Sequence, residues 1–85
     1  MKYREIHRSY QKHGKGWVRF DEDDFGIVEQ KNVDLATSYD TRKFFKSIGS
    51  KESISKETDG SVVIDSLSPD KQFRTIIRFE VIKEG

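Results

Sequence analysis

The last third of the chain alternates strand-forming segments with tight-turn signals, and this spacing limits how the strands can pair. Thr58-Asp59-Gly60 supplies the Asp-Gly pair that tolerates the positive φ angles of a short hairpin turn. In Ser68-Pro69-Asp70-Lys71, the proline fixes the φ angle that the second residue of a turn requires. Residues 62–67 and 73–82 are rich in β-branched and aromatic side chains. Connections this short leave no room for crossover helices, so the strands are predicted to be antiparallel.

Residues 41–48 carry the clearest helical pattern. Asp40 or Thr41 is the expected N-cap, because a short side-chain oxygen accepts hydrogen bonds from the first turn. Gly49 stands where a glycine commonly ends a helix. One side of this helix is apolar and holds Phe44, Phe45 and Ile48. A helix of this length is unstable alone, so we expect it to pack against the sheet.

The first half of the chain is less regular. Residues 1–16 suit either a helix or a strand, since Tyr and Ile occur in both patterns, and His13-Gly14-Lys15-Gly16 is a predicted turn. Residues 17–20 and 25–30 are predicted to form a hairpin, and the like-charged residues 21–24 between them a solvated loop at its tip. Residues 31–39 are expected to be a short strand or an extended connector.

Together these segments predict an α+β fold. We expect one domain spanning residues 1–85, with a small twisted antiparallel sheet of about four to six strands and one short helix packed on it. Ile77, Phe79 and Val81 should face one side of the sheet, because strand side chains alternate between faces. The edge of strand 73–82 is a candidate for pairing two copies into a homodimer.

Composition favours a folded intracellular domain. Apolar residues make up 33% and charged residues 36%, a balance close to that of disordered chains, but ten aromatic residues can supply a small core. There is no cysteine, so disulfides and thiolate metal sites are excluded. Small secreted domains usually depend on such links, and no apolar run is long enough to span a membrane, so we expect a cytoplasmic protein.

Charge is distributed unevenly along the chain. Residues 1–20 hold six basic side chains and one acid, whereas residues 21–30 hold five acids and no base. Complementary charge sets association rate and partner choice in protein complexes. The four consecutive acids are therefore our candidate protein-binding residues: Asp21, Glu22, Asp23 and Asp24. The run begins like a calcium loop, but Phe25 and Asn32 occupy two of its ligand positions, so no metal is predicted.

A nucleic-acid-binding surface is the alternative hypothesis. Single-strand binders combine basic side chains that follow the backbone with aromatic side chains that stack on bases. The residues that fit are Lys12, Lys15, Trp17, Arg19, Arg42, Lys43 and Lys46. The hypothesis requires the basic N-terminal segment and the basic side of the helix to converge on one surface. The competing interpretation places Trp17, Phe20 and Phe25 in the core of a hairpin.

No arrangement in the sequence indicates catalysis. The chain has no nucleophile-elbow serine and no glycine-rich phosphate loop, and its two histidines lack the further ligands that zinc requires. We therefore predict no catalytic residues, no metal and no cofactor. The expected function is a small non-catalytic interaction protein that binds and modulates a larger protein, of the kind found in phages and mobile elements.

Overall fold

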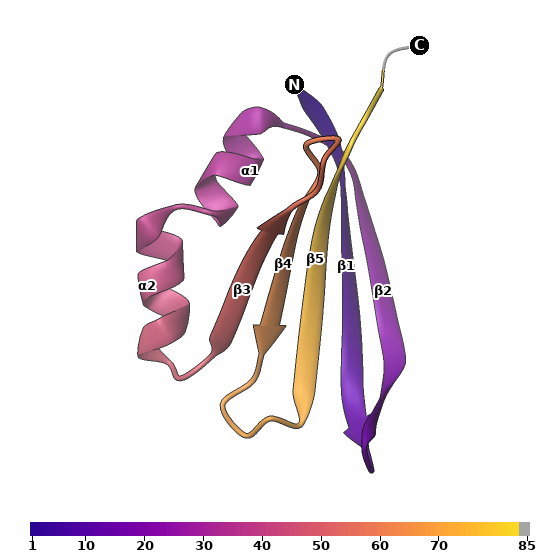
Figure 1. The fold of residues 1–85 in the computed structure, drawn as a ribbon, viewed down its shortest axis with the longest axis vertical. Coiled ribbons are helices and arrows are strands. Elements are labelled where there is room, and N and C mark those ends of the chain that lie inside the picture. The colour runs from indigo at the N-terminus through magenta and orange to yellow at the C-terminus, as the bar shows by residue number, and fades with distance from the viewer. Residues whose placement is uncertain (84–85) are drawn as a thin grey trace.

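The computed structural model describes residues 1–83, which form one five-stranded antiparallel sheet with two short helices (Figure 1). The strand order is β2-β1-β5-β4-β3. The strands are β1 (Lys2–His13), β2 (Gly16–Glu29), β3 (Lys51–Lys56), β4 (Val62–Leu67) and β5 (Phe73–Val81). The helices α1 (Gln30–Ala36) and α2 (Tyr39–Ser47) lie between β2 and β3 in the sequence. The predicted α+β class and antiparallel sheet are confirmed.

Strands β1 and β2 form a long hairpin in the part of the chain where the sequence showed no regular pattern. Residues 2–13 are strand, and the predicted turn at 13–16 is confirmed, with Gly14 at φ 58°. The prediction of a loop at 21–24 is wrong, because these acids lie in the middle of the 14-residue strand β2. Residues 17–20 and 25–30 are consequently not two strands of one hairpin. Arginines on β1 lie across from part of the acidic run and offset the repulsion that favoured a loop.

The helical part comprises two helices where one was predicted. The segment 31–39 was expected to be extended, but most of it is α1, whose start is stabilised by a capping box between Glu29 and Asn32. The second helix begins at Tyr39, two residues earlier than expected, because the Ser38 side chain accepts from the Thr41 backbone N–H and is the actual N-cap. The helix ends at Ser47, one residue before the predicted end, and Gly49 just beyond it has φ 90°, as predicted for the glycine that ends the helix.

The C-terminal third follows the sequence prediction closely. Strands β3, β4 and β5 pair in order, and both predicted turns are present. The Glu57 N–H donates to the Ser61 carbonyl across the Asp59-Gly60 turn, and the Lys71 N–H donates to the Ser68 carbonyl across the second turn. Gly60 has φ 95°, the left-handed conformation that the Asp-Gly signal predicts.

The core is small and off-centre. The buried apolar side chains are Tyr3, Val33, Val62, Ile64 and Phe79. Val33 belongs to α1, and the other four share one face of the sheet, with Ile77 and Val81 packed against them. Figure 1 shows both helices gathered on the β3 side of the sheet. The β1–β2 side therefore receives little helical cover. Within residues 1–83, neither helix has the length and apolar character that crossing a membrane demands.

Candidate functional site

The strand register assigns side chains to two faces of the sheet. We call the face that carries the core the helix-side face and the opposite one the open face. On β1 the odd-numbered residues from Tyr3 to Gln11 lie on the helix-side face, opposite Val81 to Phe73 of β5. The even-numbered residues of β1 lie on the open face. This alternation decides where each candidate residue can act.

All the lysines and arginines of the edge strand β2 and of its inner neighbours β1 and β5 lie on the open face. They are Lys2, Arg4, Arg8, Lys12, Arg19, Arg74 and Arg78. The helix-side positions of the same strands include Glu5, Asp21 and Asp23 and no lysine or arginine. On these three strands the open face therefore carries seven basic and four acidic side chains, the acids being Glu22, Asp24, Glu29 and Glu80. The excess of base on this face and of acid on the other is not visible in the net charge of +1.

The candidate acidic run is divided between these faces. On the open face, Arg8 Nε donates to Glu22 Oε1 at 2.6 Å and Arg4 Nε donates to Asp24 Oδ2 at 2.9 Å. These hydrogen bonds are the largest cause holding the pKa of each carboxyl below its ordinary value. Within residues 1–83, Asp21 and Asp23 have neither an ion-pair partner nor a side-chain hydrogen bond. They lie across from Ser9 and His7 on the helix-side face.

The lowered pKa values of Glu22, Asp24 and two turn aspartates predict that the fold is sensitive to acid. A carboxyl whose pKa is lower in the folded state stabilises the fold above its unfolded pKa, and that contribution disappears as pH falls through the folded pKa. The pKa values of Glu22 and Asp24, and of the turn residues Asp59 and Asp70, are all lowered. We expect the urea midpoint, followed by circular dichroism, to be flat near neutral pH and to decline below about pH 4.

Two double variants with the same net charge test the cause of this pH dependence. Replacing Arg4 and Arg8 by glutamine removes the chief cause of the pKa shifts at Glu22 and Asp24 and should make the decline shallower. Replacing Lys12 and Lys15 by glutamine changes the net charge equally, but neither lysine forms an ion pair within residues 1–83. The same slope in both double variants would contradict the explanation.

Two irregularities in β2 aim phenylalanines at the helix-side face. The β1–β2 register shifts between Ser9 and Tyr10 and again between Glu5 and Ile6, which leaves Phe20 and Phe25 without opposite residues. Such bulges commonly redirect a side chain. The Phe25 ring lies 4.5 Å from the His7 ring, and the Phe20 ring lies 6.2 Å from that of Phe73 in an edge-to-face arrangement.

Phe20, Phe25 and Phe73 form what we call the aromatic surface. Their exposures are 59%, 58% and 45%, so the prediction that Phe20 and Phe25 are core residues is wrong. Beside them, between α2 and the sheet, lies an apolar hollow of about 330 Å³. Its lining includes His7, Phe45, Ile64, Thr75 and Ile77. His7 belongs to both features, and its Nε2 lies 2.6 Å from Glu5 Oε2.

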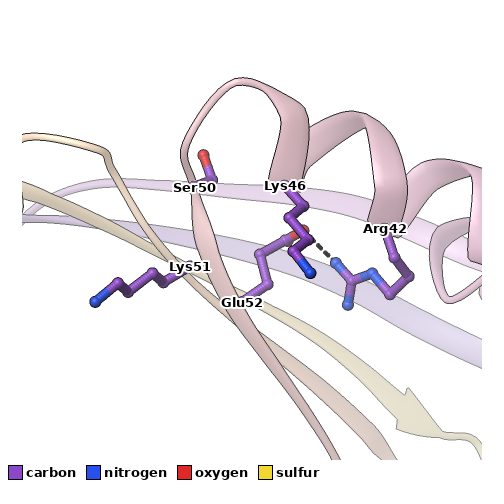
Figure 2. A pocket seen from close by; sticks show the side chains of 5 residues that line it. All are labelled: Arg42, Lys46, Ser50, Lys51 and Glu52. Atoms are coloured by element: carbon purple, nitrogen blue, oxygen red, sulfur yellow. Dashed lines mark hydrogen bonds and ion pairs between the residues drawn. The ribbon is translucent and has the colours of Figure 1, made fainter.

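An ion pair closes the α2 side of the hollow. Arg42 on α2 and Glu52 on β3 point toward each other, while Lys51 is directed away from them (Figure 2). Their side chains are only 22% and 10% exposed. The Arg42 Nε atom is buried and has no hydrogen-bond partner. The Arg42 guanidinium therefore pairs with Glu52, and its Nε–H remains an unsatisfied donor at the wall of the hollow.

The structure does not bring the seven nucleic-acid candidates together. Lys12, Trp17 and Arg19 lie on the open face, where the Arg74 guanidinium lies 6.0 Å from the Trp17 ring. Lys15 is in the turn of the β1–β2 hairpin. Arg42 lies on the helix side, paired with Glu52, and Lys43 and Lys46 are exposed on α2. The convergence that the nucleic-acid hypothesis required is absent.

Comparisons with known proteins add no further assignment: no family model, no curated protein and no solved structure matches this chain. Within residues 1–83, no three His, Asp or Glu side chains are grouped so that they could hold a metal ion. The aromatic surface, Asp21 and Asp23 were not singled out together from the sequence, because only the two bulges place them on one face.

Proposed function

We propose that this chain is a non-catalytic binding protein that docks on a larger protein through its aromatic surface. The observation that carries the proposal is the position of Phe20, Phe25 and Phe73 on one face, about half exposed, beside an apolar hollow. Clustered exposed aromatics next to a concave apolar site are typical of protein interfaces, where a few buried aromatic anchors supply most of the affinity.

The free energy available from burying the three rings of the aromatic surface favours a role in an interface over a role in the folded core. Burying a whole phenylalanine side chain contributes about 1.5–3 kcal/mol, so covering the exposed half of each ring contributes roughly 1 kcal/mol. Three rings and the apolar lining of the hollow then provide several kcal/mol toward association. The same rings add little to folding, because the buried core comprises other residues.

Site-specific photo-cross-linking tests this function. We expect a photoreactive phenylalanine analogue at Phe25, in cells of the native host, to yield a discrete protein adduct. Phe44 on α2 is the matched control, because both side chains are 58% exposed. The Phe73→Ser substitution should reduce the adduct at Phe25 several-fold and leave any adduct at Phe44 unchanged. Equal labelling at the two positions, or no adduct at Phe25, contradicts the proposal.

The open face supports nucleic-acid binding as a second candidate. It gathers seven basic side chains with Tyr10 and Trp17. It ranks second because five of the seven, all arginines, already form ion pairs: Arg4, Arg8, Arg19, Arg74 and Arg78. The same experiment separates the two functions, since nuclease-sensitive adducts with the analogue at Tyr10 and none at Phe25 favour nucleic acid.

A further inference from the structure

We infer that the partner presents a cationic amphipathic segment to the aromatic surface, with apolar side chains flanked by lysine or arginine. The inference rests on the proposed function and deepens it by assigning the chemistry of the partner. Three observations carry it: the exposure of the aromatic surface, the charge of the face around it, and the absence of an internal partner for two aspartates within residues 1–83.

The charge around the aromatic surface is uniformly acidic on the strands that form it. The helix-side positions of β1, β2 and β5 include three carboxylates, Glu5, Asp21 and Asp23, and no lysine or arginine. The seven basic side chains of these strands lie on the opposite face of the sheet. The exposed lysines of α2, Lys43 and Lys46, lie beside β3. An approaching segment with basic side chains is therefore attracted to the β1–β2 part of the helix-side face, and an acidic one is repelled.

Asp21 and Asp23 are placed to recognise that charge. They lie between Phe20 and Phe25 in β2, and both are exposed. Glu22 and Asp24, by contrast, are neutralised by arginines on the open face. Glu5 is close to His7, and Arg42 across the hollow is paired with Glu52. Asp21 and Asp23 thus remain available to a basic partner.

A second copy of the chain does not fit this surface. In a two-fold dimer the same patch meets itself, so the two pairs of Asp21 and Asp23 would be brought together. Antiparallel pairing of two β2 edges about their middle would likewise align the acidic run 21–24 with its copy, and like charges opposite one another destabilise a sheet. The same repulsion disfavours nucleic acid on the β1–β2 part of this face.

Selection from a library of short random peptides displayed on phage, with the full chain immobilised, tests the inference. We expect the enriched peptides to be positively charged and to contain aromatic or aliphatic residues. The Asp21→Lys/Asp23→Lys variant, in which two charges are reversed, should bind the selected peptides with at least about tenfold lower affinity. Glu80→Lys on the open face is the control, and it should leave their affinity nearly unchanged.

The outcomes separate this inference from the proposed function. Enriched peptides that are neutral or acidic, or whose affinity is the same for the Asp21→Lys/Asp23→Lys variant, overturn the inference. If those peptides nevertheless lose affinity with Phe25→Ser, the aromatic surface remains a protein-binding site of different specificity. Failure to enrich any peptide also overturns the inference, whereas the proposed function is then decided by cross-linking at Phe25.

Discussion

Replacing Phe79 by alanine is expected to remove a large part of the free energy of unfolding of this protein. Phe79 is 2% exposed and is the largest of the fully buried side chains. Truncating a buried phenylalanine costs about 3–5 kcal/mol, through lost burial and the cavity left behind. Stability of about 0.05–0.15 kcal/mol per residue gives a chain of this length roughly 4–13 kcal/mol in total. The substitution therefore removes a large part of it.

Urea unfolding followed by circular dichroism measures this effect. Phe44→Ala is the control, because it removes the same atoms from a side chain that is 58% exposed on α2. We expect the control to change the free energy of unfolding by less than about 1 kcal/mol. A comparable loss in the two variants would show that the core does not depend on Phe79.

Local signals explain why the C-terminal third was predictable. The Asp59-Gly60 and Pro69-Asp70 turns specify their backbone angles from adjacent residues, so β4 and β5 follow from the sequence alone. The alternation of Ile77, Phe79 and Val81 then identifies the buried face. None of these steps requires knowledge of a distant residue.

The acidic run illustrates a non-local determinant. Four like charges in succession favour a loop when they are considered alone. In the fold, Arg4 and Arg8 of the neighbouring strand hydrogen-bond to two of them. The position of Lys2, Arg4, Arg8 and Lys12 at even numbers was a usable signal for one basic face, but only once residues 1–16 were known to be a strand.

The helices and the candidate site were harder for a different reason. In residues 31–39, the odd-numbered apolar residues Val33, Leu35 and Tyr39 resemble the alternation of a strand. The capping box between Glu29 and Asn32 was the overlooked helix signal. At the site, strict alternation would place Phe20 and Phe25 on opposite faces. The two bulges bring both to the helix-side face, and no residue pattern in the sequence specified them.

Replacing Glu52 by alanine is expected to destabilise the protein by about 3 kcal/mol, because the charge of Arg42 then stays partly buried without a partner. The Arg42 and Glu52 side chains are 22% and 10% exposed, and Arg42 Nε already lacks an acceptor. The double variant Arg42→Met/Glu52→Leu should recover most of this loss. An apolar pair of similar volume avoids the desolvation of both charges.

A double-mutant cycle in urea, comparing Arg42→Met, Glu52→Leu and their double variant with the parent, measures the coupling between Arg42 and Glu52. The matched pair is Arg8 and Glu22, which is also an ion pair between an arginine and a glutamate. Its side chains are 34% and 42% exposed. Solvent screening limits an exposed pair of this kind to less than about 1 kcal/mol. The difference between the two cycles isolates burial as the cause, since the chemistry of the pairs is the same. Equal coupling in both would mean that the wall of the hollow tolerates an unpaired arginine, and that water reaches Arg42 in solution.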